Sequence, residues 1–311
     1  MSNLSPDLVI ALARSQLYQN IRVYFANHKV SEVEVPLLGR GAPQEPHLQS
    51  IEVSTGGAPL YLQTSPEFFM KRLLSQGSGD IFTITKAFRG GEVGERHNPE
   101  FAILEWYRLG FSVNELIDDV IALLRFLGVS EQVEQTTYAN AFENAVGLNP
   151  HSATDAALKV VAEDTGLIGA LDRSETLDFL MTELVEPTLG NGLVAISDYP
   201  ACQSELAQLK SDSNGIEVSD RFEIYLNGKE IANGYNELTD LEEHRARFVK
   251  ARLLRREMQL PELNIDDQFL AALERGLPSC AGVALGLDRL LMLMNDAPDI
   301  ADVMHFPWRS L

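Results

Sequence analysis

The alternation of apolar and polar residues predicts that the chain opens with a helix and continues into a strand. Residues 5–7 (Ser-Pro-Asp) supply an N-cap with proline in the first turn, and apolar side chains recur at helical spacing through residues 10–24. Residues 30–35 alternate with a period of two, which is typical of a half-buried strand, and the pattern stops at Pro36. The loop at residues 39–46 is rich in glycine and proline and is suited to covering a site.

Further along, the same pattern predicts a mixture of strands and helices. The expected strands are residues 60–63, 81–88 and 103–107, and the expected helices are residues 66–74 and 113–124. A strand-to-helix passage that contains glycine is expected at residues 281–294. Residues 130–190 are mixed and mostly helical, without recognisable chemistry, and we interpret them as an insertion.

Two further predicted strands, residues 221–226 and 229–232, are joined by Asn-Gly, the pair preferred in a type I′ hairpin turn. In such a hairpin Tyr225 lies opposite Glu230, and Glu223 shares the face of Tyr225. The two glutamates are then diagonal neighbours, which repel each other unless a cation such as Mg²⁺ lies between them. The hairpin alone also fits two solvated glutamates at a sheet edge.

The composition is that of an ordinary soluble protein. Of the 311 residues, 45% are hydrophobic and 23% are charged. No apolar run approaches the roughly 18 residues that a membrane span needs, so we expect a cytoplasmic protein that does not bind a membrane. The cysteines Cys202 and Cys280 lack partners at metal-ligand spacing and are expected to be reduced and structural.

The net charge of −20 results from 45 acidic and 25 basic side chains. This excess disfavours a broad basic surface for tRNA or DNA, although local basic pockets are compatible with it. The excess of acidic side chains is also explained by solubility alone, without a specific partner.

Two segments carry side chains suited to charged ligands. Glu105 and Tyr107 lie on one face of a predicted strand, where a carboxylate and a phenol together suit an ammonium group. The loop at residues 88–101 holds three glycines, two arginines and one histidine, a set that suits phosphates. Taken alone, Tyr107 also fits an ordinary half-buried tyrosine, and the loop also fits a surface turn.

These segments resemble the class II lysyl-tRNA synthetase family. Residues 88–89 (Phe-Arg), 97–101 (His-Asn-Pro-Glu-Phe) and 104–107 (Leu-Glu-Trp-Tyr) are together similar to motif 2 of that family. Residues 282–290 are similar to motif 3, and the helix and strand that end at Pro36 are similar to motif 1. The Leu-Glu-Trp-Tyr ending is closer to the truncated members of the family that attach (R)-β-lysine to elongation factor P. The resemblance covers nearly the whole chain.

The resemblance implies an α+β fold with the class II aminoacyl-tRNA synthetase catalytic core, an antiparallel sheet flanked by helices. It implies one catalytic domain over residues 1–311, with the insertion at about 130–190 and without the anticodon-binding barrel of the synthetases. With no such barrel and a net charge of −20, tRNA is a poor candidate acceptor. A homodimer through the motif 1 region, residues 10–36, is also expected.

The resemblance also assigns site residues. Arg89 and Arg289 are the implied catalytic residues, and Arg89 would bridge the amino-acid carboxylate and the α-phosphate. The residues implied to bind ATP are Arg89, Glu92, His97, Asn98, Phe101 and Arg289. Those implied to bind the amino acid are Ser65, Glu67, Glu105, Tyr107, Asn233, Glu237 and Ala284. Glu223 and Glu230 match the family's Mg²⁺ ligands, which favours the metal interpretation of the hairpin.

The implied activity is an ATP-dependent ligase with Mg²⁺ as cofactor. It forms an adenylate of (R)-β-lysine and transfers the β-lysyl group to a lysine of elongation factor P. Three glutamates and one arginine complement the two ammonium groups and one carboxylate of such a substrate. Two alternatives are a free-standing ligase that uses α-lysine with another acceptor, and a non-catalytic paralogue that binds a lysine metabolite.

The sequence departs from the synthetase pattern at two places. Motif 2 of the synthetases usually reads Arg-Asn-Glu after the phenylalanine, whereas here Gly90 and Gly91 follow Arg89 and Glu92 comes next. The adenine-side contact is then expected from Glu92 or from the backbone. At Ala284 the synthetases have glycine and the β-lysine ligases have alanine, and a methyl group there can shift which isomer fits.

Overall fold

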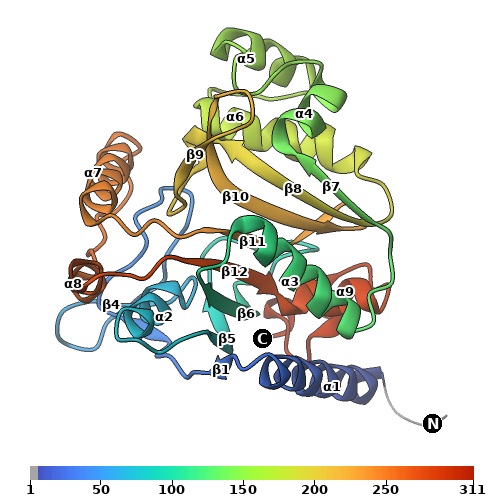
Figure 1. Ribbon diagram of the computed structural model, residues 1–311, viewed down its shortest axis with the longest axis vertical. Coiled ribbons are helices and arrows are strands. Elements are labelled where there is room, and N and C mark those ends of the chain that lie inside the picture. The colour runs from blue at the N-terminus through green and yellow to red at the C-terminus, as the bar shows by residue number, and fades with distance from the viewer. Residues whose placement is uncertain (1–5) are drawn as a thin grey trace.

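A large mixed sheet forms the centre of the computed structural model, which describes residues 6–311 (Figure 1). Within these residues eight strands follow the order β1-β5-β6-β12-β11-β10-β8-β7, and β9 pairs with β10 at the side of this path. Their bounds are β1 Ser31–Glu32, β5 Ile81–Phe88, β6 Glu100–Leu109, β7 Val133–Thr137, β8 Leu193–Pro200, β9 Leu209–Ser211, β10 Glu217–Leu226, β11 Lys229–Asn236 and β12 Cys280–Gly286.

The strands from β5 to β8 pair antiparallel, and only the outer pairs β1–β5 and β7–β8 are parallel. A separate small sheet pairs β2 (Leu38–Gly39), β4 (Leu60–Leu62) and β3 (Glu52–Val53). The expectation of an α+β fold built on an antiparallel sheet is therefore confirmed.

Helices cover the sheet on both faces. Their bounds are α1 Pro6–Asn27, α2 Glu67–Leu74, α3 Val113–Phe126, α4 Tyr138–Val146, α5 Asp155–Asp164, α6 Arg173–Leu180, α7 Leu241–Glu257, α8 Asp267–Arg275 and α9 Leu287–Met294. Shorter helical segments are 181–185, 186–188, 201–203, 300–303 and 308–310. None of the helices within residues 6–311 combines the length and apolar character needed to cross a membrane.

Period-two alternation in the central strands separates the core from the functional face. Leu104 and Trp106 of β6, and Val283 and Leu285 of β12, are buried in the core with α1, α3 and α9. The residues between them point to the opposite face of the sheet. The capping box of Ser112 begins α3 and fixes the start of this amphipathic helix.

Residues 130–190 form a lobe at the top of the view in Figure 1, where α4, α5 and α6 share a hydrophobic cluster with β8. The segment is mostly helical, as predicted, but the interpretation missed β7 at its start. This strand extends the central sheet, because Val133 pairs with Leu193 and the ladder runs to Thr137. Its side chains are largely exposed, so apolar periodicity gave no signal for it.

The predicted strand at residues 30–35 was too long. Only Ser31 and Glu32 pair with β5, although the N–H of Val33 still donates to the carbonyl of Phe82 at 2.8 Å. Sequence analysis also missed β8, whose residues are buried on both faces and so do not alternate. The predicted N-cap at residue 5 lies outside the described residues.

Candidate active site

A cavity of about 1030 Å³ lies on the face of the sheet opposite α1 and α3. All fifteen residues assigned to the site by resemblance line this cavity: Ser65, Glu67, Arg89, Glu92, His97, Asn98, Phe101, Glu105, Tyr107, Glu223, Glu230, Asn233, Glu237, Ala284 and Arg289. Glu45 and Pro46 at the end of the glycine- and proline-rich loop, and the next two residues, also line it, as expected for a covering loop. Four strands, β6, β10, β11 and β12, therefore meet helices and loops from distant parts of the chain at one cavity.

The β10–β11 hairpin forms as predicted, and its two turn residues have φ of 52° and 69°, as a type I′ turn requires. Tyr225 pairs with Glu230, again as predicted. The register then shifts by one residue at Ile231, so Glu223 pairs with Asn233. A regular hairpin would have placed Asn233 on the other face.

This bulge sets which side chains of β11 reach the cavity. Glu230 and Asn233 both line it, although they are three positions apart. Tyr235 and Glu237 continue the alternation that starts at Asn233 and also line the cavity. Because of the bulge at Ile231, the carboxylate of Glu230 and the polar side chains that follow it on β11 face the same cavity.

At one end of the cavity Glu105 is almost fully buried, with 3% of its surface exposed. Tyr107 donates a hydrogen bond to its Oε1 at 2.6 Å, and Ser65 donates to its Oε2 at 2.8 Å. Burial, reinforced by the negative charge of Glu67, raises the pKa of Glu105 to about 7. An ammonium group placed here would favour the ionised carboxylate.

Two more carboxylates, Glu67 and Glu237, share a cation from the protein itself. The Nζ of Lys71 lies 3.0 Å from Glu67 Oε2 and 2.6 Å from Glu237 Oε2. Burial raises the pKa of Glu237 to about 8, although Lys71 acts in the opposite direction. Sequence analysis assigned Lys71 no role.

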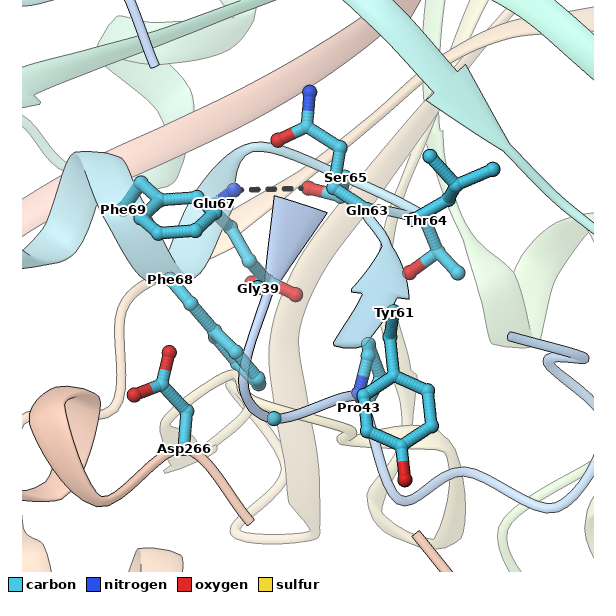
Figure 2. A pocket seen from close by; sticks show the side chains of 12 residues that line it. Gly39, Pro43, Tyr61, Gln63, Thr64, Ser65, Glu67, Phe68, Phe69 and Asp266 are labelled. Carbon is cyan, nitrogen blue, oxygen red and sulfur yellow. Dashed lines mark hydrogen bonds between the residues drawn. The ribbon is translucent and has the colours of Figure 1, made fainter. Parts of the chain in front are cut away.

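Figure 2 shows a small pocket beside the start of α2. The backbone N–H of Glu67 donates to the Oγ of Ser65 at 3.1 Å, which is the dashed line in the figure. The small pocket of about 20 Å³ adjoins this turn and shares Thr64, Ser65 and Glu67 with the large cavity. The turn therefore places Ser65 and Glu67 together at the start of α2.

The glutamates proposed as metal ligands both face the cavity. Arg221 Nη2 lies 2.8 Å from Glu223 Oε1, and the hydroxyl of Tyr225 donates to Glu223 Oε2 at 2.5 Å. Burial and the negative charge of Glu230 raise the pKa of Glu223, as expected for neighbouring carboxylates. Two adjacent carboxylates are oxygen donors of the kind that Mg²⁺ prefers, so this donor set fits the ion.

The other end of the cavity is basic. The guanidinium of Arg89 lies over the ring of Phe101, 5.2 Å from its centroid. Arg289 Nη2 is 3.1 Å from His97 Nε2, and its Nη1 is 3.3 Å from Glu230 Oε2. Burial and then the charge of Arg289 lower the pKa of His97. Cationic and aromatic groups therefore stand together where the resemblance places ATP.

The two glycines that depart from motif 2 lie against Gln49. The N–H of Gly90 donates to the carbonyl of Gln49 at 2.8 Å, and a Cβ on Gly90 would lie 2.9 Å from the Gln49 side chain. Gly91 has a φ of +77°, which disfavours other residues. Glu92 follows with its Oε1 3.8 Å from Arg89 Nη1, so it remains at the cavity wall.

Asn98 lines the cavity, but both ends of its side-chain amide are engaged by the backbone. Its Nδ2 donates to the carbonyl of Glu100 at 2.6 Å, and its Oδ1 accepts from the N–H of Trp308 at 2.8 Å. These bonds tie the motif 2 loop to the C-terminal segment. The structure therefore favours a role in loop anchoring over a direct contact with a nucleotide.

Sequence analysis also missed Arg221, which is buried at the cavity wall. Its guanidinium contacts Glu223, lies 3.1 Å from Glu205 Oε1 and donates to Asn233 Oδ1 at 3.2 Å. The position of Arg221 two residues before Glu223, on the same face of the strand, was a usable signal. The sequence signal for Lys71 was weaker, because helical spacing alone does not reveal which carboxylates a lysine pairs with.

Comparison with known proteins agrees with this geometry. The chain matches the family of class II tRNA synthetases (D, K and N) over residues 8–310. Relatives named elongation factor P–(R)-β-lysine ligase match nearly the whole chain. That of Histophilus somni (strain 2336) is 42% identical, covering 95% of this chain and 94% of the relative. That of Baumannia cicadellinicola is 43% identical (94% and 93%), and that of Proteus mirabilis is 41% identical (97% and 96%). The chain therefore belongs to the class II tRNA synthetase family (D, K and N), as its motifs indicated, and groups there with the elongation factor P–(R)-β-lysine ligases.

Proposed function

We propose that this protein is an ATP-dependent ligase that activates (R)-β-lysine as an adenylate and transfers it to a lysine of elongation factor P. The names of relatives that are 41–43% identical over nearly the whole chain support this assignment. The class II synthetase family supports ATP as the activating substrate.

The observation that carries the proposal is the separation of charge along the cavity. One end holds Glu67, Glu105 and Glu237, and the other holds Arg89, His97 and Arg289. A diamino acid would place its ammonium groups at the acidic end and direct its carboxylate toward the basic end. An acidic or wholly apolar amino acid would leave the buried carboxylates without partners and would be rejected.

Each end of the substrate has candidate partners. Glu105, Tyr107 and Glu237 would hold the side-chain ammonium, and Ser65 and Glu67 would lie near the second amino group. Asn233, which accepts from Arg221 at 3.2 Å, would donate through its amide to the substrate carboxylate. Ala284 would form the floor between these groups.

At the basic end, Phe101 would stack on adenine and Arg289 would cover its other face, with Glu92 near the ring edge and His97 near the outer phosphates. The substrate carboxylate then attacks the α-phosphorus in line, and the bond to pyrophosphate breaks. Arg89 and Arg289 stabilise the charge that develops on the transferring group. Glu223 and Glu230 would hold Mg²⁺, which supplies charge neutralisation for the phosphates. A lysine amine of the acceptor next attacks the mixed anhydride, forming an amide and releasing AMP.

The proposal also covers the domain organisation, assembly, location and acceptor of the enzyme. A single catalytic domain, with residues 130–190 as an insertion, would act as a homodimer in the cytoplasm. The net charge of −20 supports a protein acceptor over tRNA. The insertion contributes to the cavity through Asp172, Arg173 and Asp178, so it lies where an acceptor would approach.

The test is pyrophosphate exchange followed by mass spectrometry. Exchange that depends on (R)-β-lysine, together with a matching mass increase on one lysine of elongation factor P, is the expected result. Exchange with α-lysine and no labelling of elongation factor P would favour a ligase with another acceptor. Binding of a diamino acid without exchange would favour a non-catalytic binding protein.

A further inference from the structure

Lys71 is a buried cation that the proposed reaction does not use. It lies on α2 with none of its surface exposed, and it does not line the cavity. Its Nζ is 3.0 Å from Glu67 Oε2 and 2.6 Å from Glu237 Oε2. Lys71 therefore stands behind two of the three glutamates at the acidic end, on the side away from the cavity.

Glu67 is held by a second group, and Glu237 lies against the cavity wall. Tyr235 donates to Glu67 Oε2 at 3.0 Å, and the ring of Tyr235 lies 5.4 Å from the Nζ of Lys71. The other oxygen of Glu237 faces Gly282, where an added Cβ would come within 2.4 Å of Oε1. One oxygen of Glu237 therefore faces Lys71, and the other faces a residue of the cavity wall.

The charges at this end can be counted. When a bound ammonium group keeps all three carboxylates ionised, they and the ammonium of Lys71 carry two net negative charges, and a diamino acid brings two ammonium groups. We propose that Lys71 is a positioning residue for substrate selection, which orients Glu67 and Glu237 and adjusts the acidic end to the charge of a diamino acid. This inference rests on the proposed function, because it assumes that the ammonium groups bind here.

The physical reason is the cost of burying unpaired carboxylates. Burial alone would lower the pKa of Lys71, but the attraction of Glu237 and then Glu67 outweighs it and raises the pKa. Without this cation, Glu67 and Glu237 would repel each other in a site shielded from water and would take up protons or move apart. Either outcome would weaken the attraction for an ammonium group.

The experiment compares Lys71→Met, Lys71→Arg, Glu237→Gln and the double variant Lys71→Met with Glu237→Gln. Binding of (R)-β-lysine is measured by calorimetry, and pyrophosphate exchange gives KM and kcat. Lys71→Met nearly keeps the volume but removes the charge, so we expect Kd and KM for the diamino acid to rise about 30-fold. The KM for ATP should stay within about twofold, because the basic end is untouched.

The double variant distinguishes charge compensation from packing. It again leaves two negative charges, from Glu67 and Glu105, but it still lacks the contact of Glu237 with the ammonium group, so its Kd should be close to that of Glu237→Gln alone and far below the product of the single effects. Lys71→Arg keeps the charge despite its larger volume and should bind more tightly than Lys71→Met. A packing role predicts the reverse order for these two variants.

Two results would overturn the inference: wild-type binding in Lys71→Met, or effects of Lys71→Met and Glu237→Gln that multiply in the double variant. A loss of ATP binding in Lys71→Met would indicate misfolding. In that case the double variant and Lys71→Arg decide whether Lys71 acts through its charge. Calorimetry needs no catalysis, so diamino-acid binding that depends on Lys71 but is not followed by exchange would refute the proposed activity and leave the inference standing.

Discussion

Tyr107 donates a hydrogen bond to Glu105 at 2.6 Å, although the two residues belong to the same strand and are only two positions apart. Ser65 occupies the other oxygen of Glu105, so both oxygens have partners in a site that water hardly reaches. Burial raises the pKa of Glu105 to about 7 and that of Glu237 to about 8. The acidic end therefore changes its charge near neutral pH.

This titration predicts how stability depends on pH. Carboxyl groups have pKa values of about 4 in unfolded chains, so the folded state holds protons that the unfolded state has released. The free energy of unfolding should fall between about pH 6.5, above the usual histidine pKa, and pH 8. We expect the Tm of the free protein to decrease over this interval, and the increase in Tm caused by (R)-β-lysine to grow.

The control is the double variant Glu105→Gln with Glu237→Gln, in which the decrease should be smaller because two of the titrating groups are absent. A Tm of the free wild-type protein that rises between the two pH values would contradict the assignment.

A second prediction concerns the proposed metal ligands. The double variant Glu223→Gln with Glu230→Gln should lose pyrophosphate exchange, because it removes the two negative charges that would hold Mg²⁺ beside the phosphates. Glutamine keeps the shape of glutamate and can still accept from Tyr225, so the fold should be retained. Exchange is measured against Mg²⁺ concentration, with thermal unfolding as the check on folding. Unchanged exchange would refute the assigned site.

A third prediction concerns assembly. We expect a homodimer through the region of residues 10–36, because α1 and the strand after it match motif 1. Leu12 and Val23 support this expectation, since 54% and 50% of their surfaces are exposed on the single chain. Light scattering should give the mass of two protomers at micromolar concentration, and Val23→Asp should shift it toward one. A wild-type mass of one protomer would contradict the dimer.

A fourth prediction concerns stability away from the cavity. Asp119 on α3 accepts hydrogen bonds from Tyr24 at 2.7 Å and from the indole of Trp106 at 3.2 Å, and so joins α1 and β6. Asp119→Ala would leave the indole N–H of Trp106 unpaired and would leave the hydroxyl of Tyr24 only the backbone carbonyl of residue 119 at 3.2 Å, which should cost about 2 kcal/mol of unfolding free energy. Urea unfolding measures this loss, and Tyr24→Phe should cost less because it removes one donor. A loss below about 0.5 kcal/mol would show that water replaces the carboxylate.

The local motifs of this fold were accessible from sequence, because turn chemistry and alternation act over a few residues. The Asn-Gly turn predicted the pairing of Tyr225 with Glu230, and the alternation around Glu105 predicted that Tyr107 shares its face. The bulge at Ile231 was not accessible, because it arises from how β11 fits between two other strands. The position of Asn233 at the cavity therefore came from family resemblance and not from alternation.

Long-range charge pairs were equally hidden. Lys71 precedes Glu237 by more than half of the chain, and its spacing from Glu67 fits an exposed helical ion pair as well as a buried one. Three glutamates carry one more charge than the two ammonium groups of the substrate can balance. The sequence did not reveal that Lys71 supplies the remaining positive charge. Strand β7 escaped for a different reason, because its exposed side chains carry no apolar pattern.

The last prediction concerns the choice between lysine isomers. Ala284 on β12 pairs with Glu105 of β6 on one side and with Asn233 of β11 on the other. Its methyl group therefore lies between a residue proposed to hold an ammonium and one proposed to hold the carboxylate. (R)-β-Lysine and α-lysine carry the same charges and differ in where the inner amine sits, so shape must discriminate between them.

A misfit of one methylene changes specificity by about 10- to 200-fold, which is enough to favour one isomer without excluding the other. Ala284→Gly should therefore raise kcat/KM for adenylate formation with α-lysine relative to (R)-β-lysine. Both isomers are measured with the wild type and the variant, and the KM for ATP serves as the control because Ala284 lies away from the basic end. A ratio of the two kcat/KM values that does not change would mean that the methyl group only fills space, and that the isomer is selected by the positions of Glu67 and Ser65.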